Sequence, residues 1–133
     1  MRIGFVGYIE KEFDVIRAEV IALRIFNEIY YNHEDNERIE IVVGATNTGT
    51  HKIIYKVARL YKYKTVGVMC NKGYDYELFP VDKLIVVGEN WGDESKTFLN
   101  SIDILYRIGG GEQSLREVKM AKKLGIKVIE YEI

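Results

Sequence analysis

Residues 104–117 read Ile-Leu-Tyr-Arg-Ile-Gly-Gly-Gly-Glu-Gln-Ser-Leu-Arg-Glu. An apolar run typical of a β-strand ends at three consecutive glycines, and an apolar pattern with helical spacing then continues to Leu124. This order predicts a strand, a tight loop and a helix. Ser114 and Glu117 have the spacing of a capping box, so we expect the helix to begin at Ser114. The glycines let a ligand approach the backbone closely, and a helix N-terminus offers unpaired N–H groups to an anion.

Segments of the same two kinds alternate along the rest of the chain. In the first predicted helix, Ile16, Val20 and Leu23 repeat at helical spacing behind a candidate cap, Asp14. We expect helices near 14–30, 50–62 and 114–124, a short helix capped by Asp93, and strands near 2–8, 39–43, 65–70, 83–87, 103–108 and 127–131. Such alternation predicts an α/β fold: one Rossmann-like domain over residues 1–133, with a mainly parallel sheet and helices on both faces.

The composition is that of an ordinary globular protein, with 47% hydrophobic and 29% charged residues. A net charge of −1 gives no general basic character, so nucleic acid is not expected as a partner. The single cysteine, Cys70, excludes an internal disulfide and favours a reducing compartment. The first apolar run is too short for a signal peptide and no run approaches the ~20 residues of a membrane span, so we expect a cytoplasmic protein with no membrane partner.

Two loops that follow predicted strands are candidates for a ligand site. In parallel sheets ligands bind beyond the carboxyl ends of the strands, and both the loop at 44–50 and the loop at 109–114 are rich in glycine and open helices. The first, Gly-Ala-Thr-Asn-Thr-Gly-Thr, lacks the lysine of a P-loop, which excludes an NTPase of that type. Thr46, Thr48 and Thr50 offer hydroxyls to a phosphate or ribose; alternatively, Thr48 or Thr50 caps the helix.

The stretch from Gly110 to Glu117 resembles the Gly-Gly-x-Gly-Thr-x-x-Glu signature of the SLOG superfamily. That superfamily includes LOG-type phosphoribohydrolases, molybdenum-cofactor carrier proteins and DNA-processing proteins. The family's proline, third glycine and threonine fall on Gly109, Gln113 and Ser114. The resemblance implies a nucleotide or nucleotide-derived ligand at the glycine loops. The candidate binding residues are Gly7, Tyr8, Gly44, Thr46, Thr48, Gly49, Thr50, Gly109, Gly110, Gly111, Glu112, Gln113 and Ser114.

The same resemblance makes Glu117 the candidate catalytic residue of an N-glycosidic hydrolase. LOG-type enzymes pair this glutamate with an arginine, whose position here falls on Glu94, with Lys96 as the nearest cation and Arg107 as a possible substitute. Loss of the arginine favours a sensor or carrier over a phosphoribohydrolase that cleaves a nucleoside monophosphate. A structural homo-oligomer is the third possibility. No cofactor can be assigned.

Other residues have two interpretations each. Trp91 could stack on a base, or it could cover the sheet edge or an oligomer contact. The two histidines, His33 and His51, lie far apart without metal spacing, so no metal site is expected. Cys70 fits a small buried apolar residue. We expect a homo-oligomer, for which Tyr55, Tyr61 and Tyr63 could supply an aromatic surface.

Overall fold

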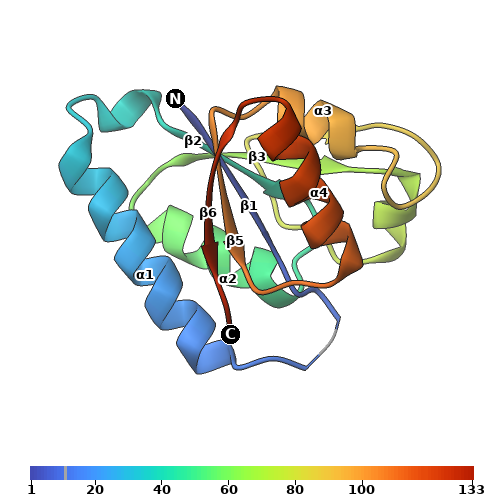
Figure 1. Cartoon of the computed structure of the whole chain (residues 1–133), viewed down its shortest axis with the longest axis horizontal. Coiled ribbons are helices and arrows are strands. Elements are labelled where there is room, and N and C mark those ends of the chain that lie inside the picture. Colours follow the sequence, from blue (N-terminus) through green and yellow to red (C-terminus); the bar gives the residue numbers. More distant parts are fainter. Residues whose placement is uncertain (11) are drawn as a thin grey trace.

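Every strand pairing in the sheet is parallel (Figure 1). The computed structural model describes residues 1–10 and 12–133. The strands lie in the order β4-β3-β2-β1-β5-β6. Their bounds are β1 Arg2–Gly7, β2 Glu40–Gly44, β3 Lys64–Met69, β4 Lys83–Val86, β5 Ile104–Ile108 and β6 Lys127–Tyr131. The α-helices are α1 Val15–Asn32, α2 Gly49–Leu60, α3 Ser95–Asn100 and α4 Glu112–Lys123. The predicted Rossmann-like α/β fold is confirmed.

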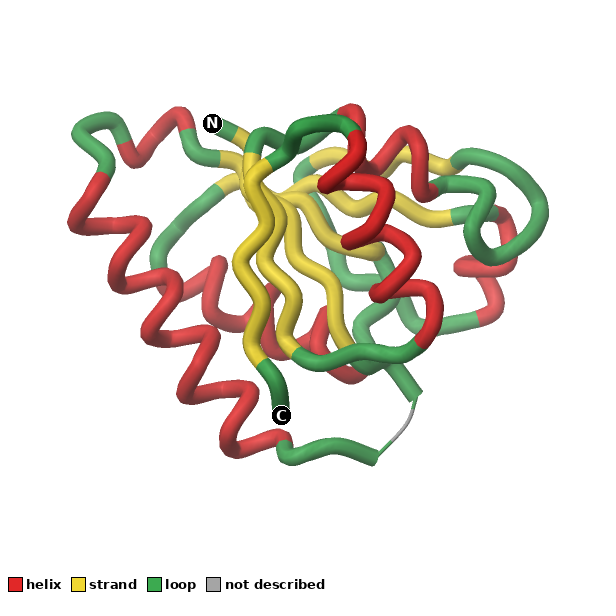
Figure 2. Tube along the Cα trace, viewed as in Figure 1, coloured by secondary structure: helices red, strands yellow, loops and turns green. Residues whose placement is uncertain are grey.

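The helices cover the two faces of the sheet in pairs, with α1 and α2 on one face and α3 and α4 on the other (Figure 2). Side chains of β1 alternate between the two resulting cores, because successive residues of a strand point to opposite faces. Ile3 and Phe5 pack with α1 and α2, whereas Val6 packs with α3 and α4. In the described part of the chain, no helix is both long and apolar enough to cross a bilayer.

Some helix ends follow the sequence signals and others do not. Asp14 caps α1, since its Oδ1 accepts a hydrogen bond from the backbone nitrogen of Arg17 at 3.0 Å. Gly125 follows the last turn of α4 with a φ of 76°. Asp93, however, does not cap α3: the position before that helix is Glu94, and the Asp93 carboxylate accepts backbone N–H groups of the preceding loop instead. The predicted cap at Asp93 is therefore wrong.

Helix α1 buries a different face from the one marked by its most regular apolar repeat. The buried residues are Ala18, Ile21, Ala22, Ile25, Phe26 and Ile29. Ile16, Val20 and Leu23, which predicted the helix, are exposed. The helix is therefore apolar on two faces, and only one of them packs on the sheet.

Of the three tyrosines expected at an oligomer surface, Tyr55 and Tyr63 are buried and Tyr61 is half-buried. Tyr55 is fully buried, stacks on Phe79 and donates a hydrogen bond from its hydroxyl to the carbonyl oxygen of Gly44 at 2.7 Å. Tyr63 is 6% exposed, and Tyr61 stacks on it. The expected aromatic surface is therefore wrong for Tyr55 and Tyr63, whereas Tyr61 keeps part of its ring at the surface.

Candidate functional site

A cavity of about 420 Å³ opens beyond the carboxyl ends of the strands. It lies where the strand order reverses, because the chain proceeds outward from β1 to β4 and then returns to place β5 on the other side of β1. Ligands of open α/β sheets bind at such a point. Its apolar floor includes Phe5, Val68, Met69 and Phe98. Its polar rim comes from five separate segments of the chain. Both glycine loops therefore contribute to a single cavity.

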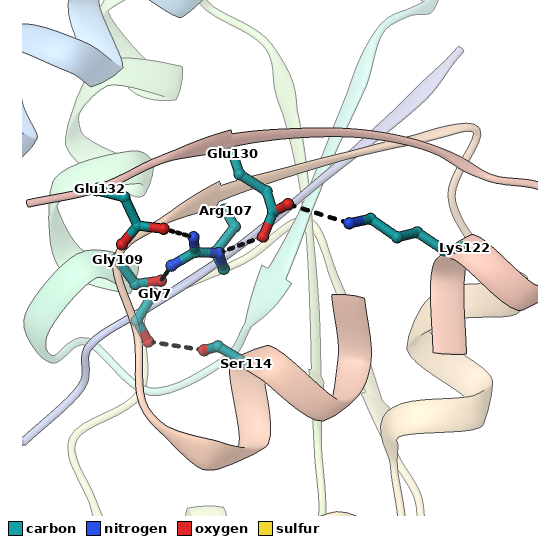
Figure 3. Close-up of polar contacts among 7 residues, drawn as sticks. All are labelled: Gly7, Arg107, Gly109, Ser114, Lys122, Glu130 and Glu132. Carbon is teal, nitrogen blue, oxygen red and sulfur yellow. Dashed lines mark hydrogen bonds and ion pairs between the residues drawn. The ribbon is translucent and has the colours of Figure 1, made fainter. Parts of the chain in front are cut away.

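The glycine loop after β5 leads directly into α4, which begins two residues before the predicted start. Gly111 is the residue before the helix, and no side chain caps it. Ser114 instead donates a hydrogen bond to the carbonyl oxygen of Gly7 at 3.3 Å, which joins α4 to the end of β1 (Figure 3). The predicted capping box of Ser114 and Glu117 is wrong, since both side chains have other partners.

The conformation of this loop requires glycine at its first two positions. Gly109 and Gly110 have φ values of 61° and 118°, which side-chain-bearing residues rarely adopt. A Cβ atom on Gly110 would also come within 2.6 Å of the Ser114 side chain. At Gly111, by contrast, a Cβ would meet no atom within 4 Å. The third glycine therefore leaves open space at the N-terminus of α4.

Arg107 forms a hydrogen bond to the glycine loop after β5. Its side chain is 5% exposed and forms ion pairs with Glu130 (2.8 Å between Nε and Oε1) and with Glu132 (Figure 3). Its Nη1 also donates to the carbonyl oxygen of Gly109 at 3.1 Å. Arg107 is therefore neither a surface charge nor one of the described residues that line the cavity, and it does not replace the missing arginine of LOG-type enzymes.

Two buried carboxyl groups face the same cavity. Glu117 and Glu94 are each 6% exposed and both line it. Glu117 Oε2 accepts a hydrogen bond from the Ser95 hydroxyl at 2.8 Å, and Glu94 Oε1 accepts one from the backbone nitrogen of Gly92 at 2.6 Å. Burial raises the pKa of Glu117 to about 7, and the neighbouring Glu94 acts in the same direction, against the Ser95 bond.

The first turn of α2 contributes a neutral histidine. His51 is 8% exposed, and burial lowers its pKa to about 4. Its Nδ1 lies 3.2 Å from the hydroxyl oxygen of Thr46, which in turn lies 3.1 Å from that of Thr48. The His51 ring also packs against Gly44 so closely that a Cβ there would collide with it. Thr48 precedes α2 but makes no side-chain capping bond, so the predicted cap by Thr48 or Thr50 is wrong.

The structure divides the sequence-predicted site residues into two groups. The cavity is lined by Gly7, Tyr8, Gly44, Thr46, Gly111, Glu112, Gln113, Ser114 and Glu117. The residues Thr48, Gly49, Thr50, Gly109 and Gly110 belong to the loops but are not among those that line it. Thr50 is fully buried behind the cavity, where its hydroxyl has no hydrogen-bond partner among the described residues. The second group shapes the loops on which the first group lies.

Several lining residues were missed or assigned another role from the sequence, among them His51, Tyr76, Trp91 and Glu94. Tyr76 comes from the connection between β3 and β4 and meets Trp91 edge-on, with ring centroids 5.8 Å apart. Trp91 lines the cavity and is 43% exposed. From the sequence, Glu94 was identified only as the position on which the arginine of LOG-type enzymes falls. Contacts between segments far apart in the sequence place these residues beside the glycine loops, so no local sequence pattern predicts their position. In the described residues, no group of three or more His, Cys, Asp or Glu side chains could hold a metal ion.

Comparison with known proteins shows similarity only among solved structures. No protein-family model matches the chain, and no curated protein sequence does. The molybdenum cofactor binding protein of Rippkaea orientalis superposes with a TM-score of 0.80 at 22% identity, over 99% of this chain and 76% of that one. The molybdenum cofactor carrier protein of Chlamydomonas reinhardtii gives 0.78 at 22%, over 97% and 74%. The structural-genomics protein TM1055 gives 0.76 at 18%, over 96% and 71%.

These similarities define the class of fold. At such identities they show the fold alone: the chain has the same Rossmann-like fold as these three proteins. Cys70 is fully buried in this fold, in agreement with its interpretation as a small apolar residue.

Proposed function

We propose that the protein, as a homo-oligomer in the cytoplasm, binds a nucleotide or nucleotide-derived ligand in the cavity at the carboxyl edge of the sheet and acts as a sensor or carrier. The observation that carries this proposal is the convergence of the two glycine loops on one cavity of about 420 Å³. Solved structures with this fold include proteins described as binding or carrying the molybdenum cofactor, which supports a small-molecule ligand here.

The phosphate end of the ligand binds at the N-terminus of α4 in this proposal. The open space beside Gly111 lies at the first turn of α4, where backbone N–H groups lack partners within the helix and carry partial positive charge. None of the described lining residues is Lys or Arg. The amides therefore supply the attraction that a cation supplies in other phosphate sites.

The ring or sugar end lies toward the two buried carboxyl groups. Glu94 and Glu117 accept hydrogen bonds, so they favour a ligand part that carries hydroxyl or N–H donors, and they disfavour a second phosphate there. Trp91 and Tyr76 supply aromatic surface beside them. The apolar floor from Phe5 to Phe98 supplies the remaining contact area for a planar ring.

A thermal-shift screen against nucleoside monophosphates, dinucleotides and pterins tests the proposal. A ligand at 100-fold excess over its Kd stabilises the folded state by about 2.7 kcal/mol. We expect Gly111→Val to abolish this shift, because its branched side chain fills the space where the ligand approaches the amides. Gly111→Ala is the matched control and should retain part of it. A shift that survives Gly111→Val unchanged, or no shift with any probe, would refute the proposed site.

One observation favours a second function, cleavage of an N-glycosidic bond. A carboxyl group with a pKa of about 7 inside a cavity is suited to act as a general acid near neutral pH. Glu117 would donate its proton to the leaving base while water attacks the sugar carbon, and its carboxylate would then take up the proton that the attacking water loses. Glu94, however, occupies the place where LOG-type enzymes hold the substrate with an arginine, and misplacement of about 1 Å can cost about a hundredfold in rate.

Chromatography of nucleoside monophosphates after prolonged incubation separates the two functions. A binder releases no free base from any of them, with the wild type or with Glu117→Gln. Base release by the wild type that disappears in Glu117→Gln would establish the hydrolase instead.

A further inference from the structure

A second cleft, here called the basic cleft, lies toward the amino ends of the strands, away from the ligand cavity. Its volume is about 380 Å³, and it is lined by the end of α2, the start of β3 and the connection from β3 to β4. Lys64 and Thr65 of β3 line it, whereas the ligand cavity is lined by Val68 and Met69 at the other end of that strand. The described residues that line the two cavities do not overlap, so the basic cleft is a separate feature of the fold.

The basic cleft has an excess of positive charge. The charged residues among its described lining are Arg59, Lys62, Lys64 and Asp82. Asp82 is already engaged, because its Oδ2 accepts a hydrogen bond from the backbone nitrogen of Thr65 at 2.8 Å and another from the Thr65 hydroxyl at 3.3 Å. None of the three cations forms an ion pair with any residue that the structure describes. Their charge is therefore available to a ligand.

Lys62 has a backbone conformation that glycine usually supplies. Its φ is 60°, and no other non-glycine residue in the described part of the chain has a positive φ. The backbone nitrogens of Lys62 and Tyr63 donate to the carbonyl oxygens of Arg59 and Ala58, which is the hydrogen-bond pattern of a Schellman motif at the end of α2. After α4 the residue with positive φ is Gly125. A lysine at such a position costs stability relative to glycine, so folding does not account for it.

Arg59 is held in a defined orientation at the wall of the cleft. Its guanidinium carbon lies 4.7 Å from the centroid of the Phe79 ring. Phe79 is fixed in turn by stacking on the buried Tyr55, with ring centroids 4.2 Å apart and an angle of 1° between the rings. A guanidinium that stacks on an aromatic face keeps its N–H donors free in the plane of the group. Arg59 therefore loses little side-chain entropy when an anion binds to it.

We propose that the basic cleft binds a compact polyanion, which is a small molecule with two or more adjacent phosphate groups. The N–H donors of Arg59 match phosphate oxygens in pairs, and Lys62 and Lys64 add positive charge on compact ammonium groups. Three cations around one cleft favour neighbouring anionic groups over a single one, and the volume is that of a small-molecule site. This inference does not depend on the ligand cavity or on the proposed function.

The surroundings of the cleft favour a small molecule over a nucleic acid. Glu40 of β2 lies level with Lys64 in the sheet. Asn36 accepts a hydrogen bond from the Tyr63 hydroxyl at 2.7 Å, which places the exposed Glu37 near the same end of the sheet. A nucleic-acid strand that continued past the cleft on this side would meet these carboxylates. The net charge of −1 also gives the chain no general attraction for nucleic acid.

Amide chemical shifts titrated with pyrophosphate at low ionic strength test the proposal and resolve the two cavities from each other. We expect the amides of residues 62–65 to shift, and the Kd obtained from them to be lower for pyrophosphate than for inorganic phosphate. Arg59→Met should raise this Kd about tenfold, because it removes charge-assisted hydrogen bonds. Salt should raise it as well, since the cations are exposed.

Lys62→Gly separates binding from backbone strain. Glycine removes the charge and relieves the positive φ, so the Kd for pyrophosphate should rise about fivefold while the Tm of the unliganded protein increases. Lys62→Arg keeps the charge and should keep most of the affinity. Lys56→Gln is the matched control: it removes an exposed cation of α2 that does not line the cleft, and it should leave the Kd unchanged.

Three results would overturn the proposal. The first is a pyrophosphate titration that leaves the amides of residues 62–65 unchanged, including one in which only residues 111–114 of the ligand cavity respond. The second is a Kd that Lys56→Gln raises as much as Lys62→Gly does, because the positive charge would then act as a diffuse surface. The third is a single-stranded oligonucleotide that shifts the same amides at lower concentration than pyrophosphate, which would assign the cleft to nucleic acid.

Discussion

The buried carboxyl group of Glu117 makes the stability of the protein depend on pH. Burial raises its pKa from 4.5 to about 7. In the unfolded chain the group titrates near its ordinary value, so between these two pH values the folded state binds more protons than the unfolded state. Stability therefore falls as pH rises through this window. At 1.36 kcal/mol per pKa unit, the whole effect amounts to about 3 kcal/mol above pH 7.

Replacement of Glu117 by Gln should remove this penalty, because the amide carries no charge and its oxygen can still accept the hydrogen bond from Ser95. We expect the free energy of unfolding of Glu117→Gln, minus that of the wild type, to increase by about 3 kcal/mol between pH 4.5 and pH 8. Urea unfolding of both proteins at half-unit steps of pH measures the difference. Groups that titrate alike in both proteins, such as His51, cancel in it. A difference that is independent of pH would refute the burial argument.

Three further outcomes follow from the site. Gly44→Ala should destabilise the protein by about 1–3 kcal/mol, because its Cβ collides with the His51 ring, whereas Gly111→Ala should be nearly neutral; denaturant unfolding compares them. Arg107→Met should lower the free energy of unfolding by roughly 2 kcal/mol, less than the loss of a fully buried ion pair, because the carboxylate partners of Arg107 reach solvent. It should also speed hydrogen exchange at the amides of Gly110 and Gly111. Exchange at the wild-type rate would contradict the conclusion that Arg107 stabilises this loop. In the wild type, His51 should contribute up to about 3 kcal/mol of added stability as pH rises from 4 to 6.5, since in this window the unfolded histidine binds a proton and the folded one does not. His51→Gln should abolish this gain.

The sequence predicted the order of strands and helices because each element has its own periodicity. The closing strand was placed correctly at Lys127–Tyr131, and the glycine loop after β5 was found from three glycines in a row. The start of α4 was placed wrongly because Ser114 and Glu117 match a local capping pattern, while their actual partners, Gly7 and Ser95, lie far away in the sequence. Local pattern recognition does not register such competing contacts.

Exposure was harder to predict than secondary structure. The apolar repeat of α1 indicated a helix, but its two apolar faces gave no basis for choosing the one that faces the sheet. Tyr55 and Tyr63 were expected at the surface, whereas packing against Phe79 and Phe26 buries them. The candidate site shows the same limit: both glycine loops were identified, but Tyr76 and Glu94 reach the cavity only through the tertiary fold.

The central claim is that ligands bind where the two glycine loops meet, and amide chemical shifts test it most directly. In ¹H–¹⁵N spectra titrated with AMP and with a pterin as probes, we expect at least one probe to shift the amides of residues 111–114 together with those of residues 44–46. Shifts confined to the basic surface cleft formed by Arg59, Lys62 and Lys64, at the opposite edge of the sheet, would contradict the claim. Spectra that neither probe changes would contradict it as well.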